Sequence, residues 1–122
     1  MNLKDLIGFT FVEMKNDIII VEKNGKFYEL DICTDDGDCC GYADFTTTFF
    51  IEGKEKPGII DVKLEDDDPD SEEDRVKVTF FGLHKKIAEI NAWASSGSGW
   101  CYGACVTITC KALDLEEVIA EW

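Results

Sequence analysis

Alternating hydrophobic and polar positions predict that most of this chain forms β-strands. The alternation is clearest in residues 26–33, where Tyr28, Leu30 and Ile32 fall on one face of an extended chain and polar residues fill the other. In residues 105–110, Val106, Ile108 and Cys110 likewise share one face. Further runs rich in β-branched and aromatic residues predict strands at 9–15, 17–23, 46–52, 59–65 and 75–83.

Two segments between these runs need separate arguments. Asn24-Gly25 lies between two β-rich runs and predicts a type I′ hairpin turn, because both central residues of that turn need positive φ. Residues 87–94 fit either a helix or a strand by periodicity. We predict a strand there, because the segment lies between two predicted strands.

Helical signals occur only at the two ends of the chain. Asn2 can cap a short helix over residues 3–7. The residues from Asp114 to Glu117 resemble a capping box and predict a short amphipathic helix, whose apolar side would carry Leu115, Val118, Ile119 and Trp122. We therefore predict an α+β fold that is mostly β, with one domain over residues 1–122, a twisted antiparallel sheet or small barrel, and short N- and C-terminal helices.

Charge adds a functional constraint to this scaffold. Twelve basic and 26 acidic residues give a net charge of −14. Residues 65–74 hold eight acids and are expected to form a solvent-exposed excursion; residues 31–44 hold five more and residues 114–121 four. Such a field repels nucleic acids and anionic membranes and attracts basic protein surfaces. The predicted partner-binding residues are Glu65, Asp66, Asp67, Asp68, Asp70, Glu72, Glu73 and Asp74.

Six cysteines raise the question of a metal site. A zinc site could draw on Cys39, Cys40, Cys101 and Cys105, since Cys101 and Cys105 have the spacing of a zinc knuckle. Cys33 and Cys39 lie too far apart for a second knuckle. The favoured alternative is reduced thiols that partly fill the core, with no cofactor.

Aromatic residues beside the glycine-containing loops suggest a possible pocket. Tyr42, Trp93, Trp100 and Tyr102 could stack on a planar ligand, or could simply cover the open ends of the sheet. The sole histidine, His84, falls in a predicted turn, and no phosphate-binding or nucleophile motif occurs. We therefore expect no enzymatic activity.

The chain also resembles a known group of proteins. Leu6-Ile7-Gly8, the loop with Asp38-Cys39-Cys40, and the aromatic strand and loop from Trp93 to Thr109 are similar to those of a family of small bacteriophage and prophage proteins. The resemblance implies a phage accessory protein in the cytoplasm of a bacterial host. The lack of an apolar run of roughly 18 residues, and Asp5 in the N-terminal segment, also favour a cytoplasmic location.

These observations lead to three functional hypotheses. The first is a non-enzymatic inhibitor of host defence, an acidic mimic of the anti-CRISPR or anti-restriction kind that binds a basic, nucleic-acid-handling host protein. The second is a sponge for a nucleotide signal, which would use the aromatic loops with Lys54, Lys56, Lys85 and Lys86, often at a homodimer interface. The third is a structural or accessory phage protein with a small zinc site.

Overall fold

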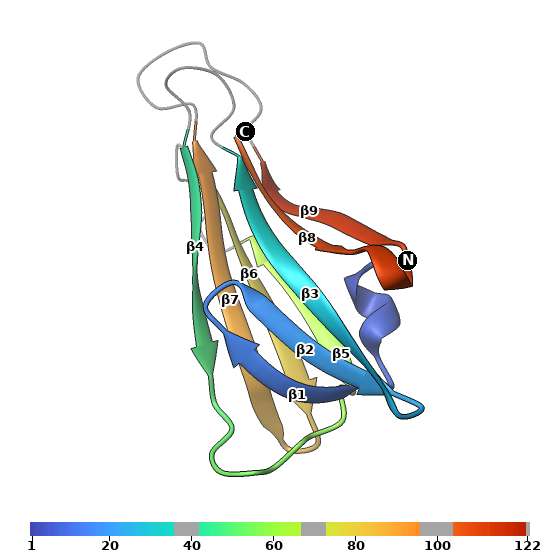
Figure 1. Ribbon diagram of the computed structural model, residues 1–122. Helices are drawn as coiled ribbons and strands as arrows, with labels where there is room; N and C mark the ends of the chain where they lie inside the picture. The colour runs from blue at the N-terminus through green and yellow to red at the C-terminus, as the bar shows by residue number, and fades with distance from the viewer. Residues whose placement is uncertain (36–41, 67–72, 96–103, 122) are drawn as a thin grey trace.

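Two antiparallel sheets pack face to face in the computed structural model, which describes residues 1–35, 42–66, 73–95 and 104–121 (Figure 1). Sheet A has the strand order β1-β2-β3-β8-β9, and sheet B has the order β4-β7-β6-β5. The strands of sheet A are β1 (Thr10–Lys15), β2 (Ile18–Lys23), β3 (Lys26–Asp35), β8 (Cys105–Cys110) and β9 (Leu115–Glu121). Those of sheet B are β4 (Tyr42–Phe49), β5 (Asp61–Asp66), β6 (Asp74–Gly82) and β7 (Lys85–Ser95).

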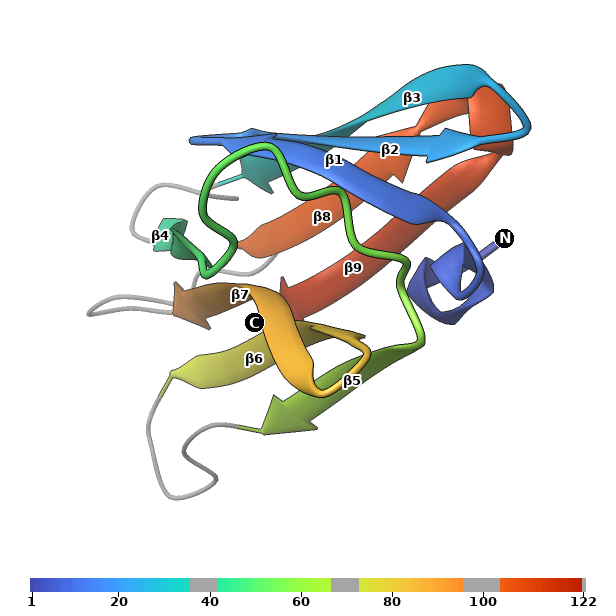
Figure 2. The same ribbon diagram turned by 90° about the horizontal axis from the view of Figure 1, so that it is seen from below.

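The hydrophobic core lies between the two layers, which Figure 2 shows from below. The ring of Phe11 in β1 packs against Phe49 of β4 and Phe80 of β6, with centroid distances of 5.6 and 5.5 Å. Phe11 and Phe80 are fully buried. These three rings join sheet A to sheet B, and each buried aromatic side chain contributes a large apolar area to the core.

Several local predictions are confirmed. Asn24 and Gly25 both have positive φ, at 54° and 79°, as a type I′ turn between β2 and β3 requires. The ambiguous segment 87–94 is a strand and forms most of β7. In β8 the side chains of Val106, Ile108 and Cys110 are buried, as the alternation predicted.

The prediction of short terminal helices is wrong. At the N-terminus, Leu3–Leu6 forms one 3₁₀ turn, η1, although Asn2 caps it as expected. At the C-terminus, Lys111–Leu113 forms a second 3₁₀ turn, η2, and the predicted amphipathic helix is strand β9. Helix propensity differs by only tenths of a kcal/mol between most residues. Pairing with β8, together with burial of Leu115, Ile119 and Ala120, outweighs it.

The sheets also do not close into the small barrel that was the alternative prediction. In the described part of the chain, no ladder of hydrogen bonds joins a strand of sheet A to a strand of sheet B. The inner faces are buried by stacking of two layers, so closure is not needed to cover the apolar side chains. Among the described residues, no helix is long and apolar enough to cross a membrane.

The acidic excursion is shorter than predicted. Glu65 and Asp66 belong to β5 and pair with Lys77 and Val76 of β6, and Asp74 is the first residue of β6. The ends of β5 and β6 were not predicted because the residues from 65 to 74 are almost all polar. Residues 67–72 lie outside the described residues.

Candidate functional site

The outer face of sheet A gathers acidic residues from four of its five strands, β1, β2, β3 and β9. Outward positions were assigned from the strand register and the alternation of buried and exposed residues. The carboxylates on this face, named here the acidic face, are Glu13, Glu22, Glu29, Asp31, Asp35, Glu116 and Glu121. Asp31 and Glu116 lie in one cross-strand row on either side of Thr109, and Asp35 and Glu121 lie in another on either side of Cys105.

Few cations balance these carboxylates. Lys15 shares the acidic face, and its Nζ lies 3.9 Å from Oε1 of Glu13. Within the described ranges, no Lys or Arg side chain lies within ion-pair distance of Glu29, Asp31, Glu116 or Glu121. These four carboxylates are therefore free to attract an external cation.

Exposed apolar side chains lie among the acids. Phe27, opposite Glu22, is 61% exposed, and Val118, opposite Thr107, is 46% exposed. Aromatic side chains are enriched at the centre of protein–protein interfaces, whose rims are polar. The acidic face thus offers both charge and an apolar anchor.

The outer face of sheet B has a different charge organisation. Its outward strand positions carry four acids (Asp44, Asp61, Glu65 and Glu89) and four bases (Lys63, Arg75, Lys77 and Lys86). Several of them pair with one another: Lys63 with Glu65 at 3.4 Å, and Lys77 and Lys86 with Glu89 at 4.0 and 3.3 Å. The excess negative charge of the strands is therefore concentrated on sheet A.

The predicted partner-binding acids of the 65–74 run divide into three groups. Asp67, Asp68, Asp70 and Glu72 lie outside the described residues. Glu65 forms an ion pair with Lys63, and Asp66 is exposed at the end of β5.

Glu73 and Asp74 form the third group and are engaged within the protein. Glu73 accepts a hydrogen bond of 2.7 Å from the hydroxyl of Tyr42 and lies 3.3 Å from Arg75. Asp74 accepts a hydrogen bond from the backbone N–H of Glu121. Both carboxylates thus have structural partners, so we do not assign them to partner binding.

The structure brings together two of the four predicted pocket aromatics. Tyr42 opposes Ser95 and Trp93 opposes Asp44, so the two aromatic residues occupy diagonal positions on the outer face of sheet B. Arg75 opposes Trp93 from the other side, on β6. Trp100 and Tyr102 lie outside the described residues. Tyr42 and Trp93 therefore lie on the same outer sheet face, at diagonal positions of neighbouring strands.

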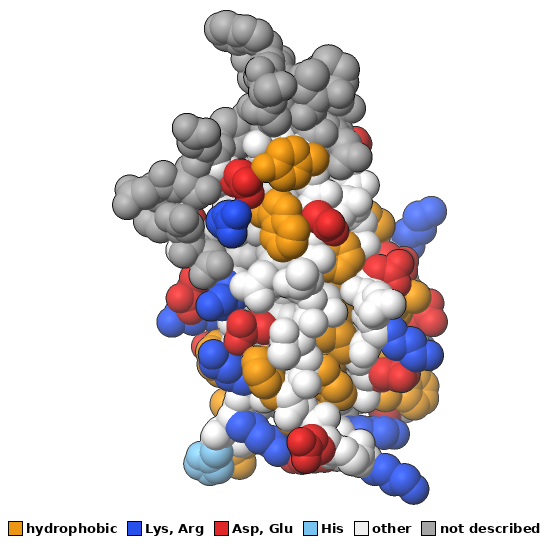
Figure 3. All heavy atoms as spheres, turned by 90° about the vertical axis from the view of Figure 1, so that its left-hand side faces the viewer, with side chains coloured by type: hydrophobic (Ala, Val, Ile, Leu, Met, Phe, Trp, Pro, Cys, Tyr) orange, Lys and Arg blue, Asp and Glu red, His pale blue; other side chains and the backbone are white. Residues whose placement is uncertain are grey.

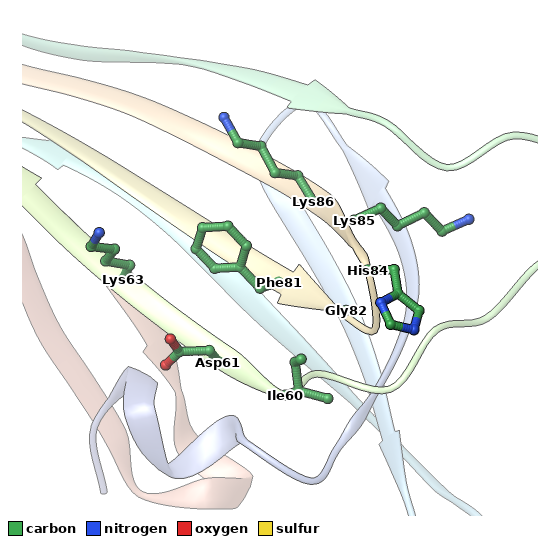
Figure 4. A pocket seen from close by; sticks show the side chains of 8 residues that line it. All are labelled: Ile60, Asp61, Lys63, Phe81, Gly82, His84, Lys85 and Lys86. Atoms are coloured by element: carbon green, nitrogen blue, oxygen red, sulfur yellow. The ribbon is translucent and has the colours of Figure 1, made fainter.

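A hollow of about 530 Å³ lies at the other end of sheet B, where β6 turns into β7 (Figure 4). Its lining includes Lys63, Lys85 and Lys86 as well as Phe81 and Asp61. Each of these lysines has a carboxylate partner: Glu65, Glu55 and Glu89 respectively. The hollow therefore has little free positive charge to offer an anion.

The position of this hollow also separates the parts of the predicted nucleotide site. Lys86 and Trp93 lie seven residues apart on β7, which corresponds to roughly 23 Å along an extended strand. Lys54 and Lys56 do not line the hollow. Lys86 and the hollow thus lie apart from Tyr42 and Trp93, whereas Trp100 and Tyr102 lie outside the described residues. The nucleotide-sponge hypothesis stays a prediction.

Of the predicted metal ligands, the structure describes only Cys105. It lies on the acidic face, opposite Asp35 on one side and Glu121 on the other. Cys39, Cys40 and Cys101 lie outside the described residues, and no group of three possible metal ligands occurs in the part that the structure describes. Cys33, Cys105 and Cys110 are free thiols, and only Cys110 is buried.

The sequence analysis did not identify the acidic face as one surface. The alternation of acidic and buried residues could have indicated it, because Glu29 and Asp31 flank the buried Leu30 in β3. Exposed acids also lie next to buried residues in β9, but this pattern was not recognised because a helix was predicted for the C-terminal segment. Without that strand, Glu116 and Glu121 could not be placed beside β8.

Comparison with protein-family models, with curated protein sequences and with solved structures found no match to this chain. The functional argument therefore rests on its own residues. The resemblance to phage proteins stays a prediction.

Proposed function

We propose that this protein is a non-catalytic binding module whose acidic face docks on a basic protein surface. The observation that carries the proposal is the charge asymmetry of the two sheets: seven carboxylates and one lysine occupy the acidic face, whereas four acids and four bases occupy the outer face of sheet B. Opposite charge steers partners together and raises the rate of association.

The apolar residues give the acidic face a second means of recognition. Phe27 and Val118 expose apolar surface that a partner could cover. Charge complementarity would orient the partner, and burial of Phe27 would slow its dissociation. The partner we infer is a protein with clustered Lys and Arg side chains and an apolar pocket between them.

A phage setting, as implied by the sequence resemblance, narrows the class of partner. Proteins that handle nucleic acids carry basic surfaces that bind phosphates. In the cytoplasm of a bacterial host, the acidic face would occupy such a surface in place of nucleic acid and inhibit a CRISPR effector or a restriction enzyme. This part of the proposal depends on the resemblance as well as on the charge asymmetry.

A pair of matched variants tests the proposed surface. Glu29→Gln/Asp31→Asn removes two charges from the acidic face, and Glu52→Gln/Glu55→Gln removes two exposed charges elsewhere. Fluorescence anisotropy with a labelled nona-arginine peptide measures binding. We expect the first variant to weaken binding about three- to tenfold, since exposed ion pairs contribute about 0.2–1 kcal/mol each. The second should weaken it less than about twofold.

Equal weakening by the two variants would show that the peptide senses only net charge, and the proposed surface would then be wrong. Unlabelled duplex DNA provides a further control, because it should compete with the protein for the same peptide. A Phe27→Ser variant tests the apolar anchor with a partner protein once one has been isolated.

A further inference from the structure

Strand edges expose unpaired backbone groups. In the described part of the chain, three of the four sheet edges are protected. Along β1, Thr10 bridges to Gly58, and the N–H of Phe11 donates to the carbonyl of Pro57 at 2.8 Å. β5 has six residues, of which Asp61, Lys63, Glu65 and Asp66 are charged. β9 carries three glutamates, and its pairing with β8 contains a bulge.

The fourth edge strand, β4, lacks these protective features. It pairs with β7 without a register shift from Tyr42 to Phe49 and contains neither Gly nor Pro. Its one charged residue is Asp44. Figure 3 shows the side of the molecule on which β4 lies, where uncharged side chains and backbone fill most of the middle, a few acidic side chains lie above and below them, and most charged side chains lie on the two flanks.

The hydrogen-bond pattern shows which residues of β4 face the open edge. The N–H of Phe50 donates to the carbonyl of Ile87, so even-numbered residues face β7 and odd-numbered residues face away from it. The N–H of Phe45 agrees with this assignment, because it donates to the side chain of its neighbour Asp44 at 2.8 Å. Within the described ranges, the N–H groups of Thr47 and Phe49 donate to no other residue.

There is also free space beside this edge. A hollow of about 540 Å³ is lined by Phe45, Thr46 and Thr47 of β4 and by Asn16 and Asp17 of the β1–β2 turn. Phe49, whose ring stacks on Phe11 at its inner side, is still 38% exposed. The edge is therefore accessible and partly apolar.

We propose that a second copy of this chain pairs its β4 with this edge. Residues 45–49 read Phe-Thr-Thr-Thr-Phe, which is the same in both directions. An antiparallel pair with Thr47 on the two-fold axis places Phe45 opposite Phe49 of the second copy and Thr47 opposite its own counterpart. On the outer face Thr46 lies opposite Thr48 of the second copy, and the two four-stranded sheets join into one of eight strands.

Charge favours this β4–β4 contact, called the seam below, over other contacts between two copies. Each chain carries a net charge of −14, so two copies repel one another over most of their surface. In the Thr47-centred register, Asp44 lies opposite Phe50 of the second copy, and no two like charges of β4 lie opposite each other. Aromatic and threonine cross-strand pairs each contribute roughly 0.2–1 kcal/mol.

Two variants at the same pair of exposed positions test the proposal. Thr46→Lys/Thr48→Lys places lysines opposite lysines of the second copy, whereas Thr46→Glu/Thr48→Lys places glutamates opposite lysines. We expect sedimentation velocity to show a dimer for the wild type, and a dissociation constant at least about tenfold higher for the double-lysine variant, equivalent to about 1.4 kcal/mol. The Glu/Lys variant should dimerise at least as tightly as the wild type.

General electrostatics predicts a different order, which makes the comparison decisive. The double-lysine variant reduces the net negative charge of each chain from −14 to −12, whereas the Glu/Lys variant leaves it at −14. If only overall repulsion between the chains mattered, the double-lysine variant would dimerise more tightly. Equal dimerisation of the two variants, or a wild type that stays monomeric at every concentration, would overturn the proposal. Amide hydrogen exchange of the wild type gives a readout without mutation, since exchange at Thr47 and Phe49 should slow as protein concentration rises.

Discussion

Asp74, at the start of β6, accepts a hydrogen bond of 2.9 Å from the backbone N–H of Glu121, at the end of β9. This contact joins sheet B to sheet A across 47 residues of sequence. It also gives a structural role to a carboxylate that the sequence assigned to partner binding. The two roles make different predictions for the same substitution.

Asp74→Ala should lower the free energy of unfolding by about 1 kcal/mol, because one exposed hydrogen bond to a carboxylate is lost. Urea denaturation followed by circular dichroism measures this change. Asp66→Ala removes the same charge from the end of the neighbouring strand β5 and is the matched control. If the two variants had equal free energies of unfolding, the structural role assigned to Asp74 would be wrong.

Glu117 ties the N-terminal 3₁₀ turn to β9, since its Oε1 accepts a hydrogen bond of 2.8 Å from the backbone N–H of Leu3. The contact is partly buried, and Leu3 itself is fully buried. Glu117→Ala should cost about 1–2 kcal/mol in the free energy of unfolding. Glu117→Gln keeps an acceptor oxygen and should cost less, and thermal denaturation would rank the two variants.

The described cysteines differ in exposure, which predicts different reactivity. Cys33 is exposed on β3, whereas Cys110, at the end of β8 and opposite Leu115 of β9, is 5% exposed. Brief alkylation of the native, reduced protein with iodoacetamide should label Cys33, while Cys110 should react only after denaturation. Peptide mass spectrometry locates the label. Modification of Cys110 in the native protein would contradict the packing of β8 against the core.

The two proposed interactions should respond to salt in opposite directions. Added sodium chloride screens attraction between the acidic face and nona-arginine, so that binding should weaken from 0.05 to 0.5 M salt, concentrations over which the Debye length falls from roughly 14 to 4 Å. The same screening reduces repulsion between two chains of net charge −14, so that the dimer should strengthen. Anisotropy and sedimentation velocity at matched salt concentrations test the two trends. A dimer that weakens with salt would indicate attraction between charged groups at the seam.

Much of the strand pattern could be predicted because it depends on local sequence. Ile19 and Val21 in β2, and Leu30 and Ile32 in β3, point inward as alternation requires, and Asn24-Gly25 supplies the turn between them. Strand β7 could be placed despite its ambiguous periodicity, because its neighbours on both sides were strands. These features need only the two-residue period of a strand and the positive φ of the turn.

The C-terminal segment shows where local reasoning failed. Leu115, Val118 and Ile119 have helical spacing, but Asp114 adopts a left-handed conformation with φ of 52°, and the chain returns along β8 as a strand. The exposed edge of β8 supplies backbone hydrogen-bond partners that an isolated segment does not have. Their contribution depends on tertiary pairing, which local periodicity does not contain.

By itself, the sequence determined the strand-rich character of the protein, the β2–β3 hairpin, the inward positions of its clearest strands and the excess of negative charge. Only the tertiary structure decided that two sheets stack, that the C-terminal segment is a strand and that acids from β3 and β9 share one face. The physical reason is that a strand fixes which side of the chain each residue faces, whereas its neighbours are selected by hydrogen bonding and burial between segments far apart in sequence. The acidic face results from such pairing, since β8 lies between Asp31 and Glu116.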